Sequence, residues 1–378
     1  MAALVIAAQR GLNLSKHRST LPRASRLVAA ISAAAISLSA AGAFANPQMV
    51  VDVRTGRVIA HEEAFRKWYP ASLTKLMTAY VTFKALKAGR LSLDSTVTMS
   101  KKAADQPASK MYFKPGSKLT LDSALKLLLV KSANDIAVAV AESVGGTLDQ
   151  FVAMMNAEAA RLGMTSTRFI NPHGLPGKGQ YTTARDLAVL ALQLKREFPE
   201  YAGYFSLEGV STGKKNYANF NMLVGRFDGA DGMKTGFICA SGFNQISSAT
   251  RNGKTVITVV LGSDSLAGRA DDSADLLQMG LTSPAGQGVP LSSLAPYGET
   301  ATVNDISAEI CNPKAAKVRS EGRDDAGRMI VRSPYIREMT RPPQYSFAGL
   351  IPGSEVAASK TGANQIANVP IPLPRPTF

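Results

Sequence analysis

The sequence predicts an α/β protein of the α+β type, in which helices flank an antiparallel sheet formed within residues 46–283. Period-two alternation of apolar and polar residues occurs over 49–62 and again after 210. Between these stretches the apolar residues take helical spacing, and a last helical pattern covers 267–281. Two distant β regions around a helical block are best accommodated in one sheet with helices packed on it.

Residues 1–45 have the composition of a secretory signal peptide. A basic segment without acidic residues is followed by the apolar stretch LVAAISAAAISLSAAGA and by Ala43-Phe44-Ala45, which has the small-x-small pattern of a cleavage site. The alternative is a single membrane anchor, which the short apolar stretch disfavours. The basic segment contains Lys16, His17, Arg18, Arg23 and Arg26.

The charge balance remains basic after removal of the predicted leader. The chain has a formal net charge of +15, and residues 1–45 contain five Lys or Arg and no acid, which leaves 15 − 5 = +10. An exported basic protein is expected to meet anionic polymers of the cell envelope rather than nucleic acid, and no compact basic-aromatic run indicates base recognition. We therefore expect a periplasmic or cell-envelope protein.

The first predicted elements are a hairpin and a helix. MVVDVRTGRVIAHE (49–62) contains two β-branched runs on either side of Arg54-Thr55-Gly56, which is typical of a hairpin. Residues 72–88 then show helical apolar spacing and end at Gly89, a common helix stop.

Three more helices are predicted between 121 and 198. An apolar helix over 121–130 is interrupted at Ser132-Ala133-Asn134, and helical spacing resumes over 135–144. Residues 147–162 begin with Thr147 and Gln150, which match a capping box. A Gly/Pro-rich loop leads to the last helix of this block, over 183–198.

After Val210 the pattern predicts strands in GMKTGF, GFNQISSATR and TVITVVLGSD. Asn252-Gly253 between the last two predicts a type I′ hairpin turn. From 284 onward the composition changes, since twelve of the twenty prolines lie in 284–378. This region is expected to be a proline-rich extension, either poorly ordered or a small accessory region.

Ser72 and Lys75 are the first candidates for chemistry. At i and i+3 on a helix they project from one face, which is apolar and therefore expected to be buried. A serine nucleophile needs a base, and burial near positive charge lets a lysine lose its proton. The alternative is a helix cap beside a solvated lysine; a second Ser-x-x-Lys at Ser123 and Lys126 shows that the spacing alone is weak.

Two further motifs strengthen this interpretation. Ser132 and Asn134 lie two apart in a predicted turn and can point into one cavity, although they could also cap a helix. Lys234-Thr235-Gly236 lies on a predicted strand, where Lys234 would attract a carboxylate and Gly236 would allow a ligand close to the backbone; a solvated lysine before a bulge is the alternative. A copy at residues 360–362 lies in the proline-rich tail and is discarded.

The order Ser-x-x-Lys, Ser-x-Asn, Lys-Thr-Gly is that of penicillin-binding proteins and class A β-lactamases. YPASLTKLMTAY, VKSANDIAVAVAE, NPHGL with YTTARDLA, and DGMKTGF with SGFN resemble the low-molecular-mass penicillin-binding proteins, specifically the serine D-Ala-D-Ala carboxypeptidases of peptidase family S11. The resemblance covers residues 47–283. It implies the DD-peptidase/β-lactamase-like fold, with the site between an all-helical lobe and the sheet.

The resemblance also implies roles and partners. Ser72 would attack the penultimate D-Ala carbonyl of peptidoglycan stem peptides, Lys75 would be the general base, and the product would be the shortened peptide. β-Lactams would trap the same serine covalently, no cofactor would be needed, and the protein would serve peptidoglycan synthesis and cell shape. The other implied roles are cleft positions for Ser132 and Asn134, carboxylate binding by Lys234, Thr235 and Arg269, and a strand position for Gly236. The residue types themselves suggest that Ser132 could relay a proton and that Asn134 could hold an amide or the lysine.

The sequence departs from the family at several points. Phe237 stands where some members have His, and neither a β-rich second domain nor a terminal membrane-binding helix is recognisable in 284–378. A D,D-endopeptidase, a β-lactamase and a non-catalytic β-lactam- or peptidoglycan-binding protein are the alternatives. The β-lactamase is disfavoured because residues 171–181 contain no acid that could activate the deacylating water.

Histidines and cysteines are few. Only His61 and His173 follow the predicted leader, and no His/Cys cluster has metal-ligand spacing. We expect His173 to be a positioned loop residue bonded to backbone. Cys239 is expected to be a small core residue behind the strand, and whether it pairs with Cys311 is left open by the sequence.

Overall fold

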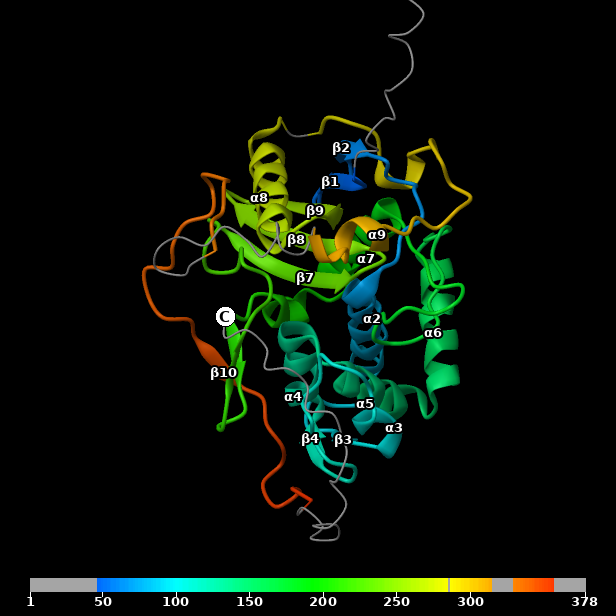
Figure 1. Ribbon diagram of the computed structural model, residues 1–378, viewed down its shortest axis with the longest axis vertical. Coiled ribbons are helices and arrows are strands. Elements are labelled where there is room, and N and C mark those ends of the chain that lie inside the picture. Colours follow the sequence, from blue (N-terminus) through cyan, green and yellow to red (C-terminus); the bar gives the residue numbers. More distant parts are fainter. Residues whose placement is uncertain (1–45, 285, 315–328, 357–378) are drawn as a thin grey trace, which may run out of the picture. The chain divides into compact units, whose positions relative to one another are not determined.

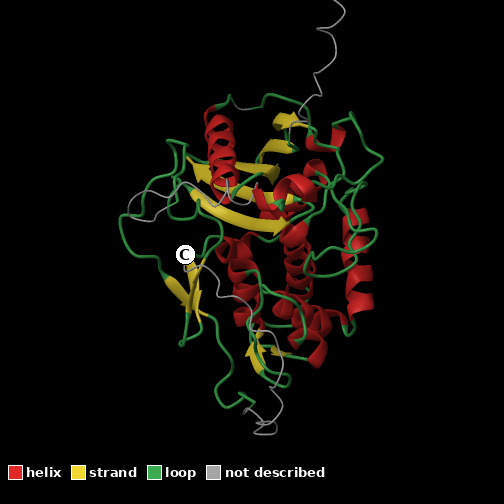
Figure 2. Cartoon of the chain, in the orientation of Figure 1, coloured by secondary structure: helices red, strands yellow, loops and turns green. Residues whose placement is uncertain are grey.

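The central sheet has five antiparallel strands in the order β2-β1-β9-β8-β7, which are labelled in Figure 1 and drawn in yellow in Figure 2. The computed structural model describes residues 46–284, 286–314 and 329–356, so the predicted leader lies outside the described residues. Pairing of β1 with β9 joins the two β regions, with Met49 opposite Val259, and this confirms the prediction of one sheet. The strands are β1 (Gln48–Asp52), β2 (Val58–Glu62), β7 (Ala230–Ile238), β8 (Gly242–Arg251) and β9 (Lys254–Ser263).

The predicted turn between β8 and β9 is confirmed. Asn252 has φ 50° and Gly253 has φ 73°, and a type I′ turn requires positive φ at both central residues. Its backbone twist matches that of the flanking strands, so the residue pair fixes the register of the hairpin.

Helices cover both faces of the sheet because successive side chains of a strand point to opposite faces. Val50 packs in one apolar cluster with Leu277 of α8 (Leu266–Thr282). Met49 and Val51 belong to a second cluster, together with Leu187 of α7 (Ala184–Glu197).

Below the sheet in Figure 1, helices and a small two-stranded sheet form a lobe whose elements lie between residues 74 and 161. Helix α2 is central to it, and most of its residues are buried all round rather than along one stripe. The elements of the lobe are α2 (Thr74–Lys87), β3 (Thr96–Thr98), α3 (Lys101–Ala104), β4 (Lys118–Thr120), α4 (Leu121–Lys126), α5 (Asn134–Gly145) and α6 (Leu148–Arg161). The sequence did not indicate β3 and β4.

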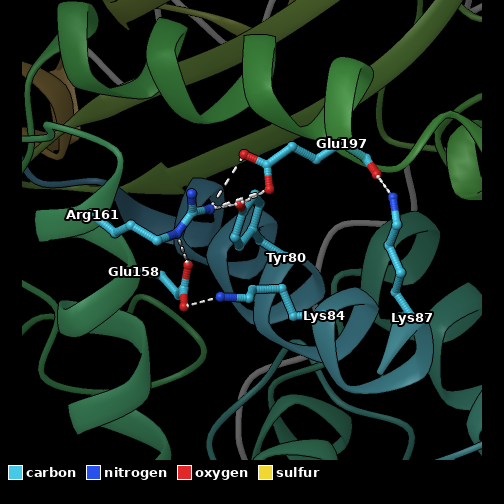
Figure 3. Close-up of polar contacts among 6 residues, drawn as sticks. All are labelled: Tyr80, Lys84, Lys87, Glu158, Arg161 and Glu197. Carbon is cyan, nitrogen blue, oxygen red and sulfur yellow. Dashed lines mark hydrogen bonds and ion pairs between the residues drawn. The ribbon is translucent and has the colours of Figure 1, made fainter. Parts of the chain in front are cut away.

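A polar cluster fixes α2 against α6 and α7. The Tyr80 hydroxyl donates to Glu197 Oε2 at 2.5 Å and accepts from Arg161, while Glu158 accepts from Lys84 Nζ at 2.5 Å and from Arg161 Nε at 2.7 Å. Charge-assisted bonds of this kind are the stronger ones in proteins. Figure 3 shows the cluster, which consists of Tyr80, Lys84, Lys87, Glu158, Arg161 and Glu197.

The predicted interruption after the second helix is confirmed, in a form the sequence did not specify. Helix α4 continues as a π-helical turn, η2 (Leu127–Lys131), and Ser132 then adopts left-handed φ and ψ of 59° and 35°. Helix α5 restarts at Asn134. Widened helical turns and left-handed residues other than glycine are uncommon and concentrate at functional sites.

The described parts of residues 284–378 lie against the sheet and the lobe. β10 (Tyr345–Phe347) pairs in parallel with β5 (Gly209–Ser211), which pairs with β6 (Asn216–Ala218). The remaining short elements are η3 (Pro199–Phe205), η4 (Leu291–Ser293) and α9 (Ser307–Ile310).

Cys239, which follows β7, is cross-linked to Cys311, with their Cα atoms 5.5 Å apart. The prediction of a small core residue at Cys239 was wrong, because the residue is only half-buried and its sulfur is bonded. The pairing that the sequence left open is thus present.

Among the described helices, none is by itself long and apolar enough to cross a membrane. Only α5 and α6 taken together reach that length and composition, and they meet at a bend of 85°.

Candidate active site

Ser72 and Lys75 point toward each other at the junction of lobe and sheet. Ser72 lies in a short 3₁₀ turn, η1 (Ala71–Leu73), which runs directly into α2, so Lys75 is in the first turn of that helix. Lys75 Nζ is 3.0 Å from Ser72 Oγ. Lys75 is fully buried, as expected from the apolar residues beside it.

Lys75 Nζ has two further acceptors. It donates to Asn134 Oδ1 at 2.7 Å and to the carbonyl oxygen of His173 at 2.8 Å. Burial, followed by the charge of Lys234, holds the pKa of Lys75 well below its usual value, and the charge of Asp135 acts more weakly in the opposite direction. An amine in this environment can be neutral near neutral pH.

The Ser132–Asn134 turn lies beside this pair. Asn134 Nδ2 donates to the Pro107 carbonyl at 3.0 Å, which orients the amide so that its oxygen faces Lys75. Ser132 lines the cleft, and its buried hydroxyl has no hydrogen-bond partner within the described part of the chain. A buried hydroxyl without a partner is unfavourable, so we interpret Ser132 as a residue that forms a hydrogen bond with the bound ligand.

Strand β7 forms the opposite wall. Thr235 and Gly236 line the cleft, and Lys234 is buried with its Nζ donating to the Thr235 carbonyl at 3.0 Å. Burial, and then the charge of Arg269, lowers the pKa of Lys234 to about 7.

Gly236 is explained by packing rather than by ligand approach alone. A Cβ on this residue would lie 3.0 Å from the Ser72 nitrogen and 3.2 Å from the Ala71 Cβ. The absence of a side chain therefore lets β7 approach the turn that carries the serine, a reason the sequence did not reveal.

Arg269 extends from α8 into the same cleft. It is almost fully buried, and its Nη2 donates to the Phe220 carbonyl at 3.3 Å. Burial lowers its pKa to about 10. Together with Lys234 it places positive charge at the cleft, and no carboxylate lines the cleft among the described residues. Such a site favours an anionic ligand.

The structure therefore brings all eight predicted site residues to one cleft of about 340 Å³ or to its immediate wall. The cleft is lined by Ser72, Ala108, Ser109, Ser132, Asn134, Gly174, Leu175, Phe220, Thr235, Gly236, Phe237, Ile238, Phe243, Leu266 and Arg269. Lys75 and Lys234 lie behind this lining. The second Ser-x-x-Lys pair, on α4, is not part of it.

His173 is a positioned loop residue, as predicted. Its Nδ1 accepts the Leu175 N–H at 3.1 Å, and burial and the nearby Lys75 lower its pKa to about 3. What the sequence missed is its carbonyl oxygen, which holds Lys75. The glycine that follows His173 is the one sequence feature related to this contact. Gly174 has φ 89°, and a Cβ there would lie 1.7 Å from the Ala71 carbonyl oxygen, so glycine lets this loop approach the turn that carries Ser72.

Among the described residues, no group of three His, Cys, Asp or Glu side chains is placed to hold a metal ion. The cleft and its immediate wall carry hydroxyls, buried amines, an amide and a guanidinium.

Comparison with known proteins agrees with this geometry. The family model described as D-alanyl-D-alanine carboxypeptidase matches residues 34–265. The chain is 36% identical over 243 residues to D-alanyl-D-alanine carboxypeptidase DacC of Escherichia coli, covering 62% of this chain and 61% of that protein. It is 32% identical over 222 residues to DacF of Bacillus subtilis, covering 58% and 57%. The chain thus spans about three fifths of the length of these relatives.

Solved structures show the same fold. DacD from Francisella tularensis superposes with a TM-score of 0.61 at 35% identity, covering 63% of this chain and 70% of that one. Penicillin-binding protein D2 from Listeria monocytogenes, in a cefotaxime-bound form, has a TM-score of 0.58 at 31% identity and covers 63% and 97%.

Proposed function

We propose that this chain, which belongs to the D-alanyl-D-alanine carboxypeptidase family, is a serine D-Ala-D-Ala carboxypeptidase that removes the terminal D-Ala from peptidoglycan stem peptides. The observation that carries the proposal is the position of Ser72 Oγ, 3.0 Å from a buried amine whose other acceptors are already in place.

The three hydrogen-bonding partners of Lys75 decide how it acts. A neutral amine has two N–H donors and one lone pair. If the two donors serve Asn134 Oδ1 and the His173 carbonyl, the lone pair is left to face Ser72 Oγ, which can then donate its proton. Asn134 and His173 thereby orient the base, and the lowered pKa of Lys75 favours its neutral form.

Acylation follows from this arrangement. Ser72 Oγ gives its proton to Lys75 Nζ and attacks the penultimate D-Ala carbonyl. The partial positive charge at the start of the η1–α2 segment favours the oxyanion. The C–N bond then breaks, and Ser132, whose hydroxyl has no other partner in the described structure, relays the proton from Lys75 Nζ to the leaving nitrogen. Lys75, neutral again, takes a proton from the water that attacks the ester carbonyl, and returns it to Ser72 Oγ as the ester C–O bond breaks.

Lys234, Thr235 and Arg269 bind the terminal carboxylate in this proposal. The carboxylate would offset the charges of these two buried cations, of which Arg269 helps to lower the pKa of Lys234, and a guanidinium pairs well with a carboxylate. β-Lactams would acylate the same serine. Two penicillin-binding protein D2 structures are of cefotaxime- and ampicillin-bound forms, which supports this expectation.

We also propose export to the periplasm or cell envelope and a role in peptidoglycan synthesis and cell shape. The leader-like composition of residues 1–45 supports export. The Cys239–Cys311 disulfide supports it independently, because structural disulfides persist in oxidising compartments.

The test is release of D-Ala from a pentapeptide ending in D-Ala-D-Ala, with labelling by a fluorescent penicillin as a second readout. We expect the wild type to release D-Ala and to be labelled by the penicillin, and Ser72→Ala to do neither. Ser123→Ala is the matched control, since it alters the serine of the second Ser-x-x-Lys and should keep both activities. Release of D-Ala by Ser72→Ala, or none by the wild type, would refute the proposal. A cross-linked peptide assayed in parallel would reveal endopeptidase activity.

A further inference from the structure

Three exposed apolar side chains gather in the cleft. Phe220 and Phe237 are each 44% exposed and Leu266 is 37% exposed, and all three line the cleft. Apolar side chains left in water contribute little to the core, and several of them around one cavity indicate a surface that a ligand covers.

All three lie around Arg269. Leu266 precedes it by three residues on α8, which places both on one face of the helix. The Phe220 carbonyl accepts from Arg269 Nη2 at 3.3 Å.

Phe237 reaches Arg269 through a second ring. The Phe237 and Phe243 ring centroids are 4.3 Å apart, and the Arg269 guanidinium carbon is 5.9 Å from the Phe243 centroid. On β7, Phe237 also shares a side with Thr235, because alternate residues of a strand point to the same face. The apolar surface and the candidate carboxylate-binding groups are therefore one region.

We propose that Phe220, Phe237 and Leu266 form a specificity pocket for the side chain of the substrate's C-terminal residue, so that D-amino acids with apolar side chains larger than that of D-Ala are also released. This inference rests on the proposed function. The carboxylate and the side chain of an amino acid are attached to the same Cα. A residue whose carboxylate binds Arg269 must therefore place its side chain within the surroundings of that guanidinium.

The reaction itself is unchanged by the larger side chain. The amide C–N bond breaks, the acyl carbon forms an ester with Ser72 and then a carboxylate with water, and the leaving amine gains a proton. What differs is the apolar area covered in the complex. Each CH₂ buried is worth about fourfold in binding, so partial burial of a D-Leu side chain should contribute about tenfold.

The experiment compares two peptides that differ only in the last residue, one ending in D-Ala-D-Ala and the other in D-Ala-D-Leu. The quantity measured is the ratio of kcat/KM for D-Leu release to that for D-Ala release. We expect the wild type to release both, and Phe237→Ser and Phe220→Ser each to lower the ratio about two- to threefold, since the three side chains share the tenfold contribution. The two variants lie on different elements, so a folding defect in one leaves the other as a test.

Phe347→Ser is the matched control, since Phe347 is 60% exposed on β10 and does not line the cleft. It should leave the ratio unchanged. A wild type that releases D-Ala but not D-Leu, or a ratio equal in all four proteins, would overturn this inference while leaving the carboxypeptidase proposal intact. No release of D-Ala from the first peptide would refute the proposed function and this inference with it.

Discussion

Asn134→Asp would place a carboxylate where an amide oxygen now accepts from Lys75 Nζ at 2.7 Å. The substitution keeps the size of the side chain and the acceptor, and changes the charge. An anion beside Lys75 favours the protonated amine, so the base that Ser72 needs would be lost near neutral pH.

The size of the effect follows from the separation. An opposite charge within about 4–6 Å changes a pKa by about 1–3 pH units, and each unit is a tenfold change in the fraction of neutral amine. Because burial has lowered the pKa of Lys75 in the wild type, raising it removes neutral amine near pH 7. Acylation there should slow by about 10- to 1000-fold, and recover as the pH is raised.

The assay is the rate of acylation by a fluorescent penicillin between pH 5 and about pH 11. The acid limb of the profile should move to higher pH by about 1–3 units in Asn134→Asp. A melting curve accompanies it, because the variant also loses the bond from Asn134 Nδ2 to the Pro107 carbonyl, a loss of about 1–3 kcal/mol.

The control is Asn216→Asp, which makes the same change at an exposed position on β6. It should leave the profile in place. If Asn134→Asp slowed acylation equally at every pH, the protonation state of Lys75 would not be the cause, and the role of this amine as base would be refuted.

Further predictions concern packing and stability. Burial lowers the pKa of Lys234 to about 7 from 10.5, so the charge of Lys234 destabilises the fold most below pH 7. Lys234→Met should therefore abolish hydrolysis and yet raise the free energy of unfolding in urea. We expect a gain of about 1–3 kcal/mol at pH 6 that shrinks as the pH rises toward 10.5, and no gain would contradict this. Gly236→Ala would press a methyl group against the Ser72 nitrogen, costing about 1–3 kcal/mol and at least about tenfold in penicillin labelling, and normal labelling would argue against this packing role. Replacing Cys239 and Cys311 by Ser opens a link across a sequence separation of 72 and should lower the free energy of unfolding by about 2–5 kcal/mol; equal urea midpoints would refute that.

Local features were readable from the sequence because the forces that set them act between neighbours. The Asn252-Gly253 turn, the break before Asn134 and the shared face of Ser72 and Lys75 depend on residues a few positions apart. The period of the apolar pattern likewise indicated strands, helices and the single sheet. The order of the three motifs, with the family resemblance, then named the site residues.

The tertiary structure decided the features that depend on contacts between distant segments, or on backbone atoms, which every residue type shares. The carbonyl oxygen that orients Lys75 belongs to the backbone of His173, so the side chains in the sequence give no indication of this contact. The need for glycine at 236 arises from contact with Ser72, and the Cys239–Cys311 pair required a 5.5 Å approach of two Cα atoms.

The electrostatics of the cleft are also a tertiary property. Ser-x-x-Lys predicts a hydroxyl and an amine on one face, but only the packing of α2 against its neighbours removes Lys75 from water and brings Lys234 near it. Desolvation and Coulomb interactions depend on distance in space, not along the chain. The sequence by itself determined which groups are present and in what order; the fold determined which of them can lose a proton.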